Sequence, residues 1–440
     1  MLMKTCFGLV WRRGCLGLVL GLLVAVGVPG RAADGASADA LASKFKLLPA
    51  PSVSGPVLRE GDRLAICGDS ITEQRMYSRV IETYVTVCVP ELQVSVRQYG
   101  WGGETAPGFL RRMTNDCLIF QPTVATTCYG MNDHGYRAYE PAIGEKYREA
   151  SRAIIRAFKG AGARVVHGSP GCVGSKVEWS QSNTDAMNQS LCALRNLGIQ
   201  LAGEEGVGFA DMFWPMMKAG ETGRERYGAD YRIAGKDGVH PDWAGHVVMA
   251  YAFLKALGLN GEIGRVTVDL AQEQVAASSG HEVHGFSQGT LTLTSHRYPF
   301  CATGDLNRDN SIRSAMTLVP FNAELNRFQL VVKGAARKEY RVVWGNTARV
   351  YKAEDLARGI NLAEDFVENP FSEAFRRVDE AVAAKQAYET RQVKTLFHGE
   401  ESLVDFDAII DLTELVRARY VSRIAGAFKP VTHALRIQPE

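Results

Sequence analysis

The sequence predicts an α/β fold built on a parallel sheet for residues 59–262, followed by a β-rich segment and a helical C-terminal segment. In the first part, short apolar runs typical of strands alternate with stretches of helical periodicity, which indicates parallel βαβ units. No Gly-x-Gly-x-x-Gly sequence follows the first apolar run, which argues against a dinucleotide-binding fold. The strand runs lie near 63–67, 93–99, 122–128, 163–168 and 206–210, and the helical patterns fill 73–87, 140–160, 183–204 and 242–257.

The N-terminus has the pattern of an export signal. Basic residues, among them Lys4 and Arg13, precede an apolar stretch from Cys15 to Val28 and then a group of small residues. The stretch is shorter than the ~20 residues that a membrane-spanning helix needs, so a cleaved signal peptide over residues 1–33 is favoured over a retained anchor. We therefore expect export to the periplasm or the extracellular space. Residues 34–58, rich in Ala, Ser, Pro and Gly, predict a linker or an extended lead-in.

Length, charge and cysteine content set outer limits on function. The 440 residues suffice for two or three domains, and the formal net charge of +2 gives no reason to expect nucleic acid or an anionic membrane as partner. No segment after the signal peptide is long and apolar enough to span a membrane, and the oligomeric state stays open. Seven cysteines remain after signal cleavage, and an odd number cannot all pair within one chain. Cys88 with Cys117, or Cys172 with Cys192, could form a disulfide in an oxidising compartment.

The sequence gives no reason to expect a metal or another cofactor. It contains no Cys-x-x-Cys pair, which argues against a structural zinc site. His281 and His284 lie three residues apart in a β-rich stretch, but no third ligand is near them in the sequence. We therefore predict a protein that works without a metal.

The second half of the chain differs in character from the first. Residues 263–353 contain several alternating or β-branched runs and the hairpin signal Gly345-Asn346, which predict a small antiparallel β-sandwich. Residues 354–440 are predicted to be a helical region, with an apolar stripe that includes Val378 and Val382. We expect that stripe to pack on the rest of the protein.

Ser70 lies in the pentapeptide Gly68-Asp69-Ser70-Ile71-Thr72, directly after the apolar run Arg63–Cys67. This pattern predicts a buried strand that ends at a tight turn and presents Ser70 at the N-terminus of the next helix. Backbone N–H groups at such a position stabilise a developing negative charge, which suits a nucleophilic serine. Alone, Gly-Asp-Ser is also a common turn sequence.

A second segment supplies the partners that a nucleophilic serine needs. Asp237 and His240 lie three residues apart, ahead of the helical pattern that starts near Asp242. An imidazole can deprotonate the serine, and a carboxylate can fix the tautomer of that imidazole and stabilise its charged form. The same residues could simply form the lead-in to the helix, and both interpretations can hold together.

Two glycine-rich turns lie between these segments, each after a predicted strand. The first is Gly100–Thr105, with Trp101, Gly102 and Gly103, and the second is Tyr129–Asp133, with Asn132. A glycine N–H and an asparagine amide are suitable donors to an acyl oxyanion. A single turn of this kind usually has no catalytic role. The occurrence of all four motifs in this order is hard to explain by chance.

Taken together, these motifs resemble the SGNH/GDSL hydrolase family over about residues 60–260. Ser70 matches the nucleophile of the first block, Asn132 the asparagine of the third, and Asp237 with His240 the last block. Gly103 matches the second-block glycine, although Gln98 and Glu104 depart from that block's usual residues and leave Gly102 as an alternative. The resemblance implies a flavodoxin-like three-layer parallel sheet and an oxyanion hole formed by Ser70, Gly103 and Asn132.

From these residues and the resemblance we expect a secreted serine esterase. The resemblance leaves several ester classes open, of which an O-acetyl ester on a carbohydrate is favoured over a lipid or a thioester because aromatic rings suit stacking on sugars and no long apolar lid is visible. A non-catalytic glycan-binding protein on the same fold is a further alternative. The candidates for a substrate cleft are Trp101, Tyr129, His134 and Trp243, and Trp179 lies in or near the predicted active-site loops. For His134 a surface or core position is favoured over the cleft.

Overall fold

The computed structural model describes residues 41–52 and 55–440 and contains one parallel and two further sheets. The predicted signal peptide, residues 1–33, lies outside the described residues. Residues 44–440 form one compact unit. No helix in the described part of the chain is both long enough and apolar enough to cross a membrane.

The parallel sheet has five strands in the order β2-β1-β3-β4-β5, and every neighbouring pair is parallel. This is the order of flavodoxin-like sheets, in which ligands bind beyond the carboxyl ends of the strands. The predicted strand runs and the α/β fold class are therefore confirmed. The strands are β1 (Arg63–Gly68), β2 (Ser95–Gln98), β3 (Val124–Cys128), β4 (Arg164–Gly168) and β5 (Gly208–Ala210).

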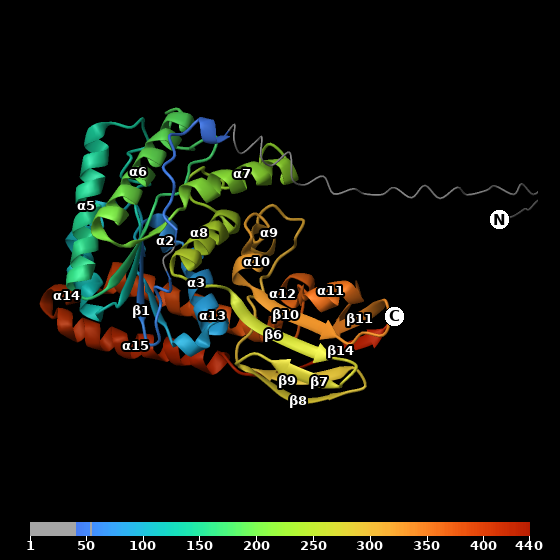
Figure 1. Ribbon diagram of the computed structural model, residues 1–440. Coiled ribbons are helices and arrows are strands. Elements are labelled where there is room, and N and C mark those ends of the chain that lie inside the picture. Colours follow the sequence, from blue (N-terminus) through green and yellow to red (C-terminus); the bar gives the residue numbers. More distant parts are fainter. Residues whose placement is uncertain (1–40, 53–54) are drawn as a thin grey trace, which may run out of the picture. The chain divides into compact units, whose positions relative to one another are not determined.

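Helices cover both faces of this sheet (Figure 1). Along β1, Leu64 and Ile66 join one apolar cluster and Ala65 and Cys67 join the other, so the strand is buried on both sides. The four predicted helical stretches are confirmed, whereas α4 and α7 were not predicted. The helices are α2 (Ser70–Glu73), α3 (Tyr77–Val87), α4 (Ala106–Asp116), α5 (Pro141–Gly160), α6 (Thr184–Glu205), α7 (Phe213–Tyr227) and α8 (Trp243–Ala256).

Part of the segment predicted as a linker or lead-in packs on the α/β part of the molecule. Residues 46–48 exchange hydrogen bonds with Arg195 and Asn196 of α6, and the N–H of Val57 donates to Leu257 O at 3.0 Å. Leu58 is buried. Of the two alternatives, the described part is thus an extended lead-in.

The β-rich segment forms two sheets rather than one simple antiparallel sandwich. Their orders are β13-β10-β6-β7 and β12-β11-β14-β9-β8, and β6 pairs with β10 in parallel. Phe328 of β10 stacks on Trp344 of β11 at 5.6 Å between ring centroids, which links the two sheets. The strands are β6 (Glu262–Asp269), β7 (Gln274–Ala277), β8 (His281–Ser287), β9 (Thr290–Ser295), β10 (Arg327–Lys333), β11 (Glu339–Trp344), β12 (Thr347–Lys352), β13 (Ile360–Asn361) and β14 (Val431–Pro439).

Two predictions for the C-terminal half need correction. The region 354–440 is not helical throughout, because its last strand, β14, inserts between β9 and β11. The boundary at 262–263 does not separate two cores, because one apolar cluster runs from α3 into the β-rich segment. The helices of this half are α9 (Ile312–Ala315), α10 (Phe321–Leu325), α11 (Ala353–Arg358), α12 (Leu362–Asp365), α13 (Ser372–Arg391), α14 (Glu400–Val404) and α15 (Phe406–Ala427).

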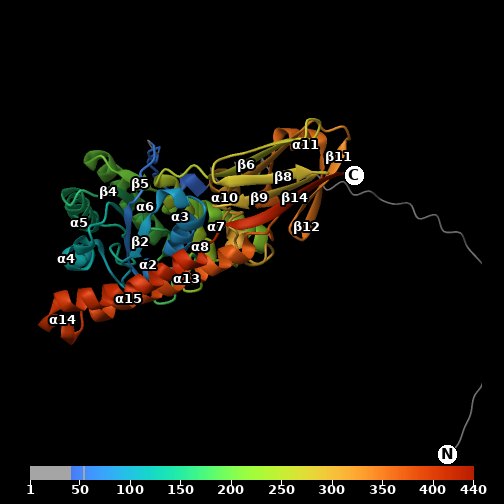
Figure 2. The ribbon, with the colours of Figure 1, turned by 90° about the horizontal axis from the view of Figure 1, so that it is seen from below.

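Helices α13 and α15 form an antiparallel hairpin that lies along β2 and α3 (Figure 2). The predicted stripe residues Val378 and Val382 are fully buried there. A group of charged side chains also lies in this interface, with Lys385 bonded to both Glu82 and Glu389. The hairpin therefore packs on the edge of the parallel sheet through apolar and ionic contacts together.

Candidate active site

The turn after β1 presents Ser70 as the sequence predicts. Strand β1 ends at Gly68, and α2 begins at Ser70 with Asp69 as its N-cap. The Asp69 carboxylate accepts the N–H of Ile71 at 3.0 Å. Burial, which outweighs this bond, raises the pKa of Asp69 to about 7. The cap fixes the turn, so that the Ser70 side chain leaves the carboxyl end of the sheet.

Ser70, His240 and Asp237 form one chain of hydrogen bonds. His240 Nε2 lies 2.8 Å from Ser70 Oγ, and His240 Nδ1 lies 2.7 Å from Asp237 Oδ2. The side chains of His240 and Asp237 are about one third and one quarter exposed, so solvent and substrate can reach them. This is the geometry in which an imidazole takes a serine proton while a carboxylate stabilises the resulting imidazolium.

The orientation of Asp237 is fixed by its own loop. Its Oδ1 accepts the N–H groups of Val239 and His240 at 2.9 and 2.8 Å, which leaves Oδ2 for the imidazole. Partial burial would raise the pKa of Asp237, but these two N–H groups and the His240 ring outweigh it and hold that pKa below its usual range. The carboxylate therefore stays ionised in the range where a histidine base works.

Gly238, between the two residues, cannot be replaced without strain. Its φ is +83°, and a Cβ there would lie 1.8 Å from the carbonyl oxygen of Lys176. The loop 169–183 is held against this segment by the N–H of Gly174 on Gly238 O and the N–H of Glu178 on Asp237 O. The same loop carries Trp179, about half exposed, whose ring centroid lies 6.0 Å from that of His240.

Backbone donors near Ser70 distinguish the two glycines of the second motif. The N–H of Gly102 donates to Glu73 Oε2, whereas the N–H of Gly103 has no acceptor among the described residues. Gly103 has φ +72° and open space around it. The Ser70 N–H, at the start of α2, likewise has no acceptor in the described part of the chain. Among the described residues the N–H groups of Ser70 and Gly103 therefore remain free, whereas that of Gly102 is occupied by Glu73.

Asn132 lies in the turn after β3, and both the nitrogen and the oxygen of its side-chain amide make hydrogen bonds. Its Nδ2 donates to Glu104 O at 3.0 Å, and its Oδ1 accepts the hydroxyl of Tyr136 at 3.0 Å. An amide nitrogen carries two protons, so one donor remains after the bond to Glu104. The bond brings Asn132 beside the Gly103 loop, and Tyr136, which the sequence analysis missed, fixes which end of the amide carries the donors.

Two of the cleft candidates are buried, which corrects the expectation for Tyr129 and agrees with the core alternative for His134. Tyr129 is buried, and its hydroxyl donates to Glu104 Oε2 at 3.1 Å. His134 is also buried, with Nδ1 bonded to Met131 O, and burial lowers its pKa to about 4. Both residues brace the core beneath the turns instead of lining a cleft. Glu104 is held in addition by a two-point ion pair with Arg112 of α4.

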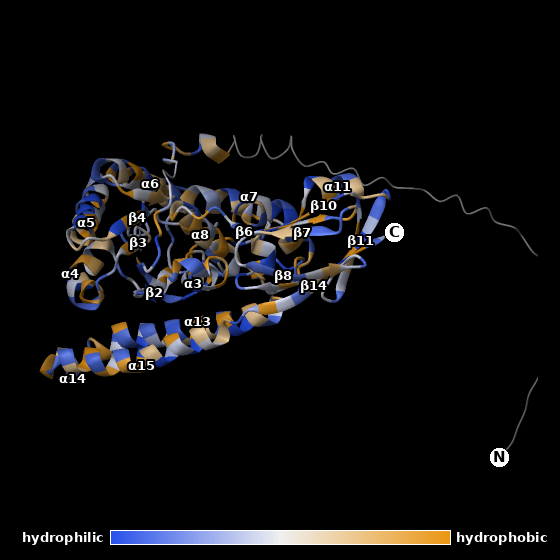
Figure 3. Cartoon of the chain, turned by 60° about the horizontal axis from the view of Figure 1, so that its bottom comes forward, coloured by the Kyte–Doolittle hydropathy of each residue, from blue (hydrophilic) through white to orange (hydrophobic). Residues whose placement is uncertain are grey.

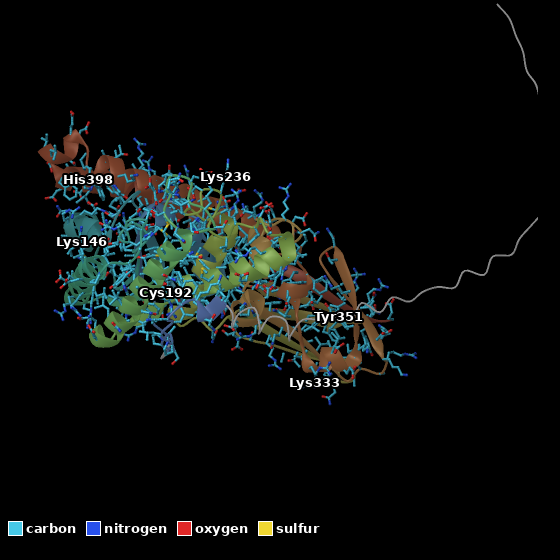
Figure 4. All side chains as sticks on the ribbon, turned by 90° about the horizontal axis from the view of Figure 1, so that it is seen from above. Lys146, Cys192, Lys236, Lys333, Tyr351 and His398 are labelled. Atoms are coloured by element: carbon cyan, nitrogen blue, oxygen red, sulfur yellow. The ribbon has the colours of Figure 1, made fainter. Side chains whose placement is uncertain are left out.

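The remaining cleft candidates, Trp101 and Trp243, are half-buried. Trp243 lies under the guanidinium of Arg79 at 5.8 Å. Trp101 packs against His398 of the C-terminal segment at 5.0 Å between ring centroids. His398 is labelled at the end of the hairpin in Figure 4. Their contact with substrate stays a prediction.

A contact that the sequence analysis missed connects the C-terminal hairpin with the candidate oxyanion loop. Lys394 Nζ donates to Glu73 Oε1 at 2.7 Å, and Oε2 of the same carboxylate accepts the N–H of Gly102. Lys394 also lies 5.6 Å from the centroid of the Trp101 ring. No local pattern could have predicted this, because Lys394 and Glu73 are 321 residues apart in the sequence.

The cysteines and the histidine pair His281 and His284 form neither a disulfide nor a metal site within the described residues. All seven cysteines there are buried free thiols, so neither suggested disulfide forms. His281 bonds to Ser295 Oγ and Ile263 O, while His284 bonds to Thr294 Oγ1. No group of three or more potential metal ligands occurs in residues 41–52 and 55–440.

Comparison with known proteins assigns the class to which this site belongs. Residues 66–248 match the GDSL-like lipase/acylhydrolase family, and this part of the chain therefore belongs to that family. The protein is thus a hydrolase of the serine esterase class. A comparison with curated proteins finds no match.

Two solved structures illustrate how far the likeness extends. A gut microbial diltiazem-metabolizing enzyme is 22% identical, with a TM-score of 0.72 and coverage of 88% of this chain and 100% of that one. That match shows the fold well beyond the family segment. An acetylxylan esterase from Geobacillus stearothermophilus is 21% identical, with a TM-score of 0.39 and coverage of 46% of this chain and 96% of that one.

Proposed function

We propose that the protein is an exported esterase that cleaves O-acetyl groups from a carbohydrate through an acyl-enzyme on Ser70. The observation that carries the mechanism is the chain of hydrogen bonds from Asp237 through His240 to Ser70. In the first step His240 takes the proton of Ser70 as Oγ attacks the ester carbonyl. His240 then protonates the leaving alcohol, and water releases the acyl group by the same route.

The oxyanion of each tetrahedral intermediate would be bound by the N–H groups of Ser70 and Gly103 and by the Asn132 amide. Support comes from the free donors at these positions and from the bonds that hold Asn132 in place. Donors fixed before the reaction cost no reorganisation in the transition state, and this makes such a site effective.

Ser70→Ala tests the nucleophile. We expect turnover of p-nitrophenyl acetate to fall by roughly 10⁶-fold, as for the loss of a nucleophile in a catalytic triad. Mass spectrometry after treatment with an organophosphonate should place the adduct on Ser70. Full activity in the alanine variant, or an adduct on another serine, would contradict the proposal.

The carbohydrate preference is supported by Trp179, an exposed indole beside His240, whose ring also meets Tyr136 edge-on at 5.7 Å. Aromatic faces of this kind suit stacking on sugar rings. We expect Trp179→Ala to lower kcat/KM for acetylated xylo-oligosaccharides by about tenfold, the effect of about 1.4 kcal/mol. Activity on p-nitrophenyl acetate should be unchanged, and Trp179→Phe, which keeps an aromatic face, should retain most of the glycan activity.

The chain-length profile separates this substrate from the alternative of a lipase or thioesterase. Acetyl esters should react faster than p-nitrophenyl octanoate or an acyl thioester. A preference for long acyl chains, or a Trp179→Ala variant with unchanged glycan activity, would overturn the carbohydrate assignment and leave the serine mechanism intact. Secretion is tested separately, by N-terminal sequencing of the exported protein for cleavage near Ala33.

A further inference from the structure

The most exposed apolar side chains of the described residues belong to α14 and α15, two helices that pack against each other. Leu403, Val404, Leu412 and Leu415 are 86%, 89%, 59% and 69% exposed, and all other large hydrophobic side chains in the described part are less exposed. Figure 3 shows hydrophobic residues at the outer side of this hairpin, away from the sheets. Soluble proteins rarely leave such a patch open unless it binds a partner.

A ridge of charged side chains crosses the same surface. Asp407, Asp411, Leu415, Arg419 and Arg423 follow one another at intervals of four residues, all are exposed, and they therefore form one row along α15. None of the four charged members makes an ion pair among the described residues. Exposed charges of α13 behave differently, because there Arg376 and Arg377 pair with glutamates on their own helix.

The order of charges along this row is symmetric about Leu415. Asp411 and Arg419 each lie four residues from Leu415, and Asp407 and Arg423 each lie eight residues from it. A helix dipole favours acidic residues in the first turn and basic ones in the last. That effect fades within one turn, and so it does not explain Asp411 and Arg419 in the middle of the 22-residue helix.

We propose that this face of α15 binds a second copy of the chain, with the two α15 helices antiparallel about a two-fold axis at Leu415. In that arrangement Asp411 faces Arg419 of the other copy and Asp407 faces Arg423, while the leucines pack together. A parallel arrangement would place like charges against each other. Rows of residues at i and i+4 pack into one another in the commonest class of helix crossing, with an angle of about −50°. The interface is isologous, as in most homodimers.

The proposal is tested first by charge reversal on either half of the row. In variant A, Asp407→Arg and Asp411→Arg make the row basic, and in variant B, Arg419→Asp and Arg423→Asp make it acidic. Each variant alone should be monomeric in sedimentation velocity at concentrations where the wild-type protein is dimeric. An equimolar mixture of A and B should form a heterodimer, because every facing pair is then complementary. The matched control carries Glu145→Arg and Glu149→Arg on the exposed side of α5 and should stay dimeric.

Recovery in the mixture shows that both variants are folded, so a folding defect cannot imitate the result. Cross-linking tests the register. Leu415→Cys should give a disulfide between the introduced thiols of two copies on mild oxidation, whereas Leu403→Cys, on the same patch but twelve residues away, should not. A wild-type protein that stays monomeric at about 100 μM, a mixture of A and B that stays monomeric, or equal cross-linking of the two cysteine variants would overturn the proposal; the concentration is chosen well above that of a micromolar complex.

Discussion

Two of the hydrogen-bonded chains of side chains in the described residues differ in their access to water. At the carboxyl end of the sheet, Asp237, His240 and Ser70 form a partly exposed chain. Between α3 and α13, Lys385 with its two glutamates forms a buried one, in which the Lys385 side chain is 1% exposed. An exposed chain can meet substrate and exchange protons, whereas a buried one has every charge already occupied by a fixed partner.

The electrostatics of the buried chain make its role structural. Burial would raise the pKa of Glu389, but Lys385 and Arg417 outweigh it and hold that pKa below its usual range. For Glu82, burial prevails over Lys385, and its pKa is raised. Glu389 is thus the ionised partner of Lys385, and together they fasten the hairpin to β2, whose Val96 O also accepts from Lys385 at 2.6 Å. The comparison teaches that a set of hydrogen-bonded charged side chains indicates catalysis only where one of its members is accessible to substrate.

The largest expected effect concerns the partly exposed hydrogen-bonded chain of Asp237, His240 and Ser70, called the open chain below. His240→Ala should lower kcat by about 10⁴-fold or more, because it removes the group that moves the proton. Asp237→Asn should cost less than His240→Ala, since the base remains in place. Steady-state kinetics on p-nitrophenyl acetate measure both effects, and urea denaturation should show near wild-type stability for each variant. Retained turnover in His240→Ala would exclude it as the base.

Lys385→Met should have the largest effect on stability. It removes one of the two cations that lie 2.7 Å from the buried Glu389 carboxylate, the other being Arg417, and also the partner of the buried Glu82. Breaking a buried ion pair in this way costs about 3–5 kcal/mol of unfolding free energy. Urea denaturation measures the loss. The double variant Lys385→Met with Glu389→Gln should regain part of it, because the uncompensated charge is then gone. Arg376→Met, on the exposed side of the same helix, is the matched control and should leave the unfolding midpoint unchanged. An unchanged unfolding midpoint for Lys385→Met would show that the buried ion pairs of Lys385 do not stabilise the fold.

These two chains also differ in how much of them could be predicted from sequence. Ser70 and Asn132 each lie in a turn directly after a strand, and the Asp237–His240 pair lies in the loop between α7 and α8. Short local patterns therefore predicted all four residues, and the fold brings them together. Lys385 and Lys394 gave no such signal, because their partners Glu82 and Glu73 are about 300 residues away in the sequence. Strand β14 escaped prediction for the same reason: the two strands with which it pairs, β9 and β11, end more than 80 residues earlier in the sequence. Tyr129 was expected in the cleft but is buried, because a motif gives the position of a residue in the sequence but not its burial.

Asn132→Ala addresses the part of the same candidate site that is proposed to act on the substrate oxyanion rather than on the proton. Loss of one oxyanion donor typically lowers kcat by roughly 10²–10³-fold with little change in KM. Tyr136→Phe is the companion variant, because it removes only the hydroxyl that orients the Asn132 amide, and it should show a smaller fall in kcat. If Asn132→Ala changes KM alone, the residue binds substrate without stabilising the transition state.

Lys394→Met should have the smallest of these effects, and it tests whether the hairpin influences the open chain. Lys394 holds Glu73, and Glu73 in turn holds the N–H of Gly102 next to the candidate donor Gly103. A loop that is less well held should lower kcat by about tenfold while KM stays the same, since only transition-state stabilisation is lost. Lys394→Arg should retain most of the activity because it keeps the ion pair. Arg391→Ala, an exposed cation at the end of α13, should have no effect. An equal fall in kcat for the methionine and arginine variants would mean that Lys394 acts through its shape and not through Glu73, and the catalytic edge would then be independent of the charges on the hairpin.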